Sequence, residues 1–167
     1  LIYDADVADS SGGPKPLAAQ AYFARLTQAL ITALKSQMAG GQLYETDMRL
    51  RPSGRQGPVA TSVAGFETYQ KAEAWTWEHL ALTRARIVAA TGTIKARLQG
   101  VIDDILGQAH DRTRVLNDVA AMRQRLAEAK GDAPLWEIKN GAGGLMDIEL
   151  IAAAGATELI ICLLAIR

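Results

Sequence analysis

Apolar and polar residues repeat with two different periods along this chain, and each period predicts one kind of element. Between residues 17 and 38, apolar residues recur every three or four positions, with Pro16 before the run and Gly40-Gly41 after it. Side chains at this spacing share one side of a helix, so the run predicts a helix with one buried face. Proline before the first turn and glycine after the last are typical helix boundaries.

Two segments instead have strand-like patterns. Residues 1–4, LIYD, form a short apolar run that ends at an acid, and a loop rich in Ser, Gly and Pro follows. In residues 42–51 uncharged and charged side chains alternate, which predicts a strand with one charged face. The proline and glycine residues of RPSGRQGP, residues 51–58, predict a loop directly after it. The charged face of the predicted strand carries Glu45, Asp47, Arg49 and Arg51.

Beyond Thr61 the pattern is helical. Helices are predicted at 63–89, 93–107, 111–130 and 145–165, with GDAPLWEIKNGAGG as the one long interruption. Helices joined by short links are typical of a bundle. We therefore predict a mostly helical α+β chain with two domains, a sheet-bearing part at residues 1–60 and a helical bundle at 61–167.

Composition narrows the possible functions. Eighteen basic residues balance eighteen acidic ones and 49% of positions are apolar, so neither nucleic-acid binding nor disorder is indicated. The single Cys162 excludes a disulfide within the chain and favours a reducing, cytoplasmic compartment. The apolar tail at 159–166 is far shorter than the roughly 20 residues of a membrane-spanning helix, so no membrane is expected. Because the first residue is Leu1 and no leader pattern follows, we expect a piece of a longer protein.

Asp47 is the main candidate for chemistry. Carboxylates held at fixed spacing on a strand bind the Mg²⁺ ions of phosphoryl and nucleotidyl transfer, and Arg49 and Arg51 on the same face could meet phosphate oxygens. The alternative is a solvated strand face whose charges pair with one another, and spacing alone favours it. Asp4 and Asp6 form a D-x-D with metal-site spacing, although such pairs are common in turns.

The remaining candidates are weaker. His79, in the aromatic segment EAWTWEHLALTRAR, and His110 lack the neighbouring ligands that zinc needs, so packing is the simpler interpretation. The glycine-rich turn in WEIKNGAGGLMDIEL could cradle phosphate on its backbone amides, but no Lys-Ser or Lys-Thr follows it. The plain interpretation is a flexible turn before a helix whose first turns carry Asp147 and Glu149, which favours the helix dipole.

Six unlike motifs, in this order and with natural gap lengths, resemble bacterial glutamine synthetase adenylyltransferases over residues 1 to about 152. Two segments of these motifs, EAWTWEHLALTRAR and DMRLRPSG, are complete, which favours an origin in the C-terminal, adenylylating half of those enzymes. The six motifs are LIYD, YFARLTQALITAL, LYETDMRLRPSGRQGPVATS, FETYQKAEAWTWEHLALTRAR, MRQRLAEAKG and LWEIKNGAGGLMDIEL.

The resemblance implies a large bifunctional enzyme in which each half joins a polymerase β-like nucleotidyltransferase domain to a helical bundle. One half would move AMP from ATP to a tyrosine of glutamine synthetase and the other would remove it by phosphorolysis, with glutamine and a PII-type signal protein setting the balance. This chain would then hold part of one nucleotidyltransferase domain and its bundle, and would take part in regulating nitrogen assimilation.

The resemblance also changes the interpretation of single residues. It implies that the family's metal-binding D-x-D lies just before Leu1, so Asp4 and Asp6 are not that pair. Asp47 then matches the third metal carboxylate, with Mg²⁺ as cofactor, and Arg49 and Arg51 are phosphate or structural partners. Three further residues are expected to approach the nucleotide from the bundle: Lys139, Asp147 and Glu149.

The chain departs from the family pattern near its end. Leu150 follows Glu149 where the family has Phe, Ala153 stands at a Gln position, and residues 154–167 match no family motif. Without two of three carboxylates the isolated chain is expected to be inactive. Two alternatives remain open: a non-catalytic helical module that binds glutamine synthetase or a PII-type protein, and a related uridylyltransferase, although no His-Asp phosphohydrolase motif occurs here.

Overall fold

A computed structural model describes residues 1–6, 9–108, 111–131 and 136–164. It is a mostly helical α+β structure, which confirms the predicted fold class. Contacts divide the chain into two compact units, Leu1–Ala74 with Thr91–Leu98 and Trp75–Ala90 with Gln99–Arg167. We call them unit 1 and unit 2 and describe each by itself.

A small parallel sheet and two helices build unit 1. Strand β1 (Ile2–Tyr3) pairs with β4 (Thr61–Ser62), with Ile2 opposite Thr61. The buried ring of Tyr3 stacks on Phe23 of α1 (Ala19–Lys35) at 4.5 Å between ring centroids. Helix α2 (Val63–Ala72) contacts both strands, and its N-cap Ser62 accepts a hydrogen bond from the Gly65 backbone. The strand predicted at LIYD is confirmed, whereas the pattern gave no sign of β4.

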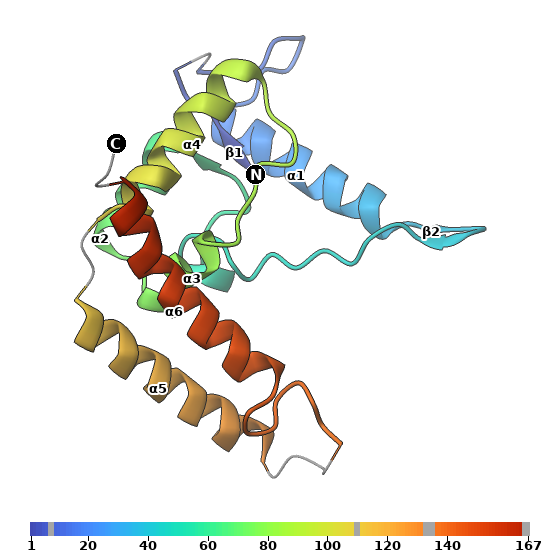
Figure 1. Ribbon diagram of the computed structural model, residues 1–167. Coiled ribbons are helices and arrows are strands. Elements are labelled where there is room, and N and C mark those ends of the chain that lie inside the picture. The colour runs from blue at the N-terminus through green and yellow to red at the C-terminus, as the bar shows by residue number, and fades with distance from the viewer. Residues whose placement is uncertain (7–8, 109–110, 132–135, 165–167) are drawn as a thin grey trace. The chain divides into compact units, whose positions relative to one another are not determined.

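The first predicted helix is confirmed but is shorter than its apolar pattern. Helix α1 ends at Lys35, and Gln37–Met38 (β2) and Gly41–Gln42 (β3) form an antiparallel hairpin, which extends beyond the end of α1 in Figure 1. Gly41 allows this tight reversal because its φ of 101° lies in the left-handed region. Met38 therefore belongs to a strand although it fits the helical period.

The strand predicted over residues 42–51 is wrong. Only Gly41–Gln42 pairs as a strand, and residues 44–49 have no regular secondary structure. A strand needs a neighbour for its backbone hydrogen bonds, and no described strand pairs with residues 44–49. The Arg49 backbone N–H instead donates to the side chain of Asp47, two positions back. Alternation alone predicted a strand, but here the Asp47 side chain takes the place of a strand partner for one backbone N–H.

The loop predicted at 51–58 is confirmed and contains a short 3₁₀ turn, η1 (Gly54–Gln56). Its chain folds back so closely that a Cβ on Gly57 would lie 1.7 Å from the Pro52 carbonyl oxygen. Only glycine fits at this position. The loop is thus a defined turn that closes the Asp47 segment at its C-terminal end.

Three mutually contacting helices form the centre of unit 2: α3 (Thr76–Leu82), α5 (Arg112–Lys130) and α6 (Leu145–Leu164). Figure 1 shows α5 and α6 side by side. Their shared apolar cluster joins Leu80, Val115, Ala153 and Ala154. Asp111 caps α5 by accepting hydrogen bonds from two backbone N–H groups. The predicted helices at 111–130 and 145–165 are confirmed.

Helix α4 (Gly92–Leu106) confirms the prediction at 93–107, and its first half belongs to unit 1 and its second half to unit 2. The single helix predicted at 63–89 is wrong, because α2 ends at Ala72 and α3 begins at Thr76. The backbone N–H of Trp75 donates to the Glu78 carboxylate at 3.0 Å and so starts a new helix. His79 lies in α3, whereas His110 lies outside the described residues.

The domain boundary predicted near residue 60 stays a prediction. Over the described residues, none of the helices combines the length and the apolar character that crossing a membrane requires.

Candidate functional site

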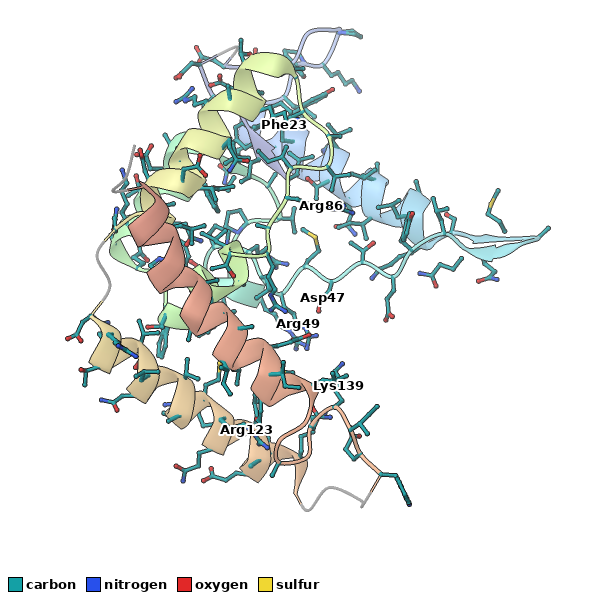
Figure 2. All side chains as sticks on the ribbon, in the orientation of Figure 1. Phe23, Asp47, Arg49, Arg86, Arg123 and Lys139 are labelled. Carbon is teal, nitrogen blue, oxygen red and sulfur yellow. The ribbon has the colours of Figure 1, made fainter. Side chains whose placement is uncertain are left out.

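Asp47 lies in the irregular part of unit 1 with its carboxylate bound to Arg49 (Figure 2). The Arg49 guanidinium donates to Asp47 Oδ2 at 2.6 Å and 2.8 Å, and the Arg49 backbone N–H donates to Oδ1 at 2.9 Å. The side chain of Asp47 remains 54% exposed and that of Arg49 70% exposed. The pair is therefore formed by neighbours in sequence and faces solvent.

This contact extends the ionisation of the carboxylate to lower pH. The Arg49 side chain, and then its backbone N–H, lower the pKa of Asp47 from 3.8 to about 2. Hydrogen bonds to the charged form of an acid favour that form. At neutral pH Asp47 is a deprotonated, accessible oxygen ligand, as a metal-binding role requires.

Arg51 stabilises the backbone of the loop. Its half-buried guanidinium donates to the carbonyl oxygens of Met48, Arg55 and Gly57 at 2.9, 3.0 and 3.1 Å. These three bonds fasten the end of the Asp47 segment to the turn that follows. Of the two functions suggested for Arg51, the geometry favours the structural one.

A complete metal site does not form from the described residues. No group of three or more His, Cys, Asp or Glu side chains within them is placed to hold a metal ion. Glu45, Thr46, Asp47 and Arg49 line a shallow cavity, in which Thr46 Oγ1 is buried without a described hydrogen-bond partner. Asp47 alone supplies too few oxygen ligands for Mg²⁺, which needs about six.

The D-x-D at Asp4 and Asp6 is occupied by an arginine. Arg97 Nη1 lies 3.1 Å from Asp4 Oδ1 and 3.1 Å from Asp6 Oδ2, all within unit 1. The two carboxylates share this one guanidinium, which compensates half of their charge. These two acids therefore hold the beginning of α4 against the first strand.

Asp147 is an anchor at the start of α6. Its carboxylate pairs with Arg123 of α5 and accepts a hydrogen bond from the Gly143 backbone at 2.7 Å. Arg123 also donates to the Asn140 carbonyl at 3.3 Å. The Arg123 side chain, and then the Gly143 N–H, lower the pKa of Asp147 below its ordinary 3.8. Figure 2 labels Arg123 on α5 and Lys139 in the turn that Arg123 fastens.

The other two candidates from the bundle differ from each other. Glu149 forms an exposed ion pair with Arg84 at 3.2 Å, whereas the exposed Lys139 has no ion pair to another described residue. The Lys139 backbone N–H donates to Glu137 at 2.7 Å, which orders the turn. Lys139, Asp147 and Glu149 all belong to unit 2 and Asp47 to unit 1. That they approach the same nucleotide stays a prediction.

Sequence reasoning missed the arginines that bind these acids. Arg97 lies more than ninety positions from Asp4, and Arg123 is 24 positions from Asp147. No periodicity links residues so far apart, so the sequence carried no signal for these pairs. Arg49, two positions from Asp47, lies on the charged face whose residues the pattern allowed to pair with one another.

Known proteins show the class of this chain. Residues 1–101 match the model of a family described as glutamate-ammonia ligase adenylyltransferase. The chain is 51% identical over 150 residues to a bifunctional glutamine synthetase adenylyltransferase/adenylyl-removing enzyme of Xanthobacter autotrophicus, and 52% identical over 153 residues to one of Bradyrhizobium diazoefficiens. The alignments cover 90% and 91% of this chain and 15% of each relative.

The class is therefore that of the adenylyltransferases. The chain belongs to the glutamate-ammonia ligase adenylyltransferase family, which confirms the resemblance found from its motifs. It spans about 15% of the length of these curated relatives.

Proposed function

We propose that this chain is part of an enzyme that transfers AMP from ATP to a tyrosine of glutamine synthetase. The other half of the same enzyme would remove that AMP by phosphorolysis, and a PII-type signal protein and glutamine would set the balance in the cytoplasm. The observation that carries the proposal is an exposed, ionised Asp47 within a motif that matches the family. The bifunctional names of the relatives support both directions.

In this proposal Asp47 supplies one carboxylate of a Mg²⁺ site, and the other carboxylates belong to another part of the longer protein. Mg²⁺ bound there would neutralise charge on the transferred phosphoryl group. Arg49 orients the Asp47 carboxylate and holds it deprotonated, and Arg51 holds the segment through three backbone carbonyls. Further contacts to the nucleotide are proposed for three residues of the bundle: Lys139, Asp147 and Glu149.

The test uses the full-length protein that contains this sequence. Asp47→Asn should lower AMP incorporation into glutamine synthetase by at least about a hundredfold, because removing a group that stabilises transition-state charge has effects of this order. Incorporation is measured with labelled ATP and Mg²⁺. Glu45→Gln is the matched control, since Glu45 is the neighbouring exposed acid, and it should retain activity.

Retained transfer by Asp47→Asn, with normal binding of glutamine synthetase, would remove Asp47 from the site. The isolated 167-residue chain should give no incorporation above a control without enzyme. Incorporation by the isolated chain would show that its own residues are sufficient for transfer.

A second candidate function is a binding module for glutamine synthetase or a PII-type protein. It is favoured by exposed apolar side chains on α6, where Ile148 is 58% and Ile151 71% exposed. A pull-down with the 167-residue chain distinguishes the two functions, because a binding module holds its partner without ATP or Mg²⁺. Ile151→Glu should then abolish capture of the partner in the pull-down. AMP transfer by the full-length protein would still require Asp47.

A further inference from the structure

Unit 2 contains a cavity of about 300 Å³ between α3 and α5, two helices in contact with each other. It shares no residue with the Asp47 segment. The residues around it come from α3, with its N-cap, and from one face of α5. They are Trp75, Thr76, Trp77, Leu80, Asp118, Val119, Ala121, Met122 and Arg125.

The walls of this cavity are mainly apolar and include two tryptophans. Leu80 is buried and belongs to the apolar cluster of unit 2, with which Val119 also packs. Trp75, at the N-cap position of α3, is 63% exposed and offers a large aromatic surface. Indole rings beside aliphatic side chains favour a planar or branched apolar group, and a cavity of this size lies at the small end of ligand pockets.

The two charged residues of the lining are not equivalent. Asp118 accepts a hydrogen bond from the Thr76 hydroxyl, and one of its oxygens lies 3.9 Å from Arg114 Nε. Arg125 is exposed, and no ion pair joins it to another residue in the part of the chain that the structure describes. Asp118 thus already has partners, whereas the Arg125 guanidinium is available to a ligand, and a guanidinium binds a carboxylate in a fixed, planar geometry.

We propose that this cavity is a binding site for a small amphipathic carboxylate. Its aromatic or branched apolar body lies against Trp75 and Trp77, and its carboxylate accepts hydrogen bonds from Arg125. The inference goes beyond the transfer reaction, because it gives unit 2 a small-molecule site that does not involve Asp47, ATP or glutamine synthetase.

The three tryptophans of the chain make the test direct. Trp75 and Trp77 line the cavity, and Trp136, which is 85% exposed in the turn before α6, does not. Each indole N–H gives one signal in a ¹H–¹⁵N spectrum, which Trp→Phe variants assign. Phenylacetate is the probe and phenylacetamide, which has the same ring and no charge, is its neutral control.

Phenylacetate should shift the signals of Trp75 and Trp77 saturably and leave Trp136 in place. Phenylacetamide should bind about fivefold more weakly, the size of effect expected for one exposed ionic contact. In Arg125→Gln the two compounds should bind equally. Lys130→Gln, which removes one positive charge from the end of the same helix outside the cavity lining, should retain the full difference.

Other outcomes overturn the proposal. They are equal shifts of all three indole signals, absence of saturation, equal affinity for the two compounds in the unaltered chain, and an Arg125→Gln variant that still prefers the carboxylate. Because Arg125 is exposed, its replacement does not threaten folding, and helical circular dichroism checks this.

Discussion

Asp47 in unit 1 and Asp147 in unit 2 bind the same kinds of group, but their arginine partners lie at very different distances along the chain. Each carboxylate pairs with an arginine side chain and accepts a hydrogen bond from a backbone N–H, and each has a lowered pKa. The arginine beside Asp47 is Arg49, two positions along the chain. The arginine beside Asp147 is Arg123, on another helix.

The difference teaches what each acid can do. Breaking the exposed pair of Asp47 and Arg49 separates only neighbours, so the carboxylate can exchange an arginine for another cation at little cost. Breaking the half-buried pair of Asp147 and Arg123 releases the turn before α6 from α5. The local pair of Asp47 and Arg49 therefore suits a metal-binding role, and the long-range pair of Asp147 and Arg123 stabilises tertiary structure.

The largest expected effect is at Gly144, in the turn that Asp147 anchors. A Cβ at this position would lie 2.6 Å from the Ile138 carbonyl oxygen. Gly144→Ala should lower the free energy of unfolding by about 1–3 kcal/mol, measured by urea denaturation. Gly100→Ala in α4, where the added methyl meets nothing within 4 Å, should raise it by about 1 kcal/mol. Equal effects would mean that the turn is not tightly closed.

A smaller effect separates the two arginines. Arg123→Met should lower the thermal midpoint, because its side chain is 23% exposed and binds both Asp147 and the Asn140 carbonyl. Arg49→Met, at 70% exposure, should lower the midpoint by less, because its pair with Asp47 is screened by solvent. Differential scanning calorimetry of the two variants gives the comparison. A similar fall in both would contradict the distinction between local and long-range pairs.

The pH dependence of Asp47 follows from its lowered pKa. A carboxyl with a depressed pKa in the folded state contributes stability that is complete above its unfolded pKa. For Asp47 this contribution is lost as the pH falls from 3.8 towards about 2. A ¹³C carboxyl titration should give a pKa of about 2, and Arg49→Met should return it towards 3.8 without altering Asp147. An unchanged value in Arg49→Met would assign the shift to another cause.

The smallest effect is that of salt. Ions screen exposed charges more than half-buried ones. Raising the ionic strength to 1 M should therefore raise the pKa of Asp47 more than that of Asp147, in the same ¹³C titration. A larger shift at Asp147 would show that its carboxylate is the more accessible of the two.

The parts of the fold that could be predicted from the sequence are those with many repeats of one period. Helices α4 and α5 lie within one residue of their predicted bounds. The strand at 42–51 could not be judged from its pattern, because alternation does not show whether a neighbouring strand exists. The long predicted helix at 63–89 failed at Trp75, where one backbone hydrogen bond to Glu78 begins a new helix.

The candidate site divides in the same way. Asp47 with Arg49 could be found because both lie in one motif. Asp147 pairs with Arg123 of α5, and Glu149 of α6 pairs with Arg84 in the turn after α3, so only tertiary structure brings these residues together. The motif also could not show that Arg51 binds backbone carbonyls, since that depends on how its loop folds.

The pairing of β1 with β4 has a consequence for how unit 1 folds. It joins Ile2 to Thr61 and so closes a loop that contains α1, the hairpin and the Asp47 segment. Contacts between residues so distant in sequence form slowly, because the chain between them must first lose its freedom. During synthesis this strand pair cannot form before Ser62 has left the ribosome. The Asp47 segment thus gains its native surroundings after α1, which can form locally.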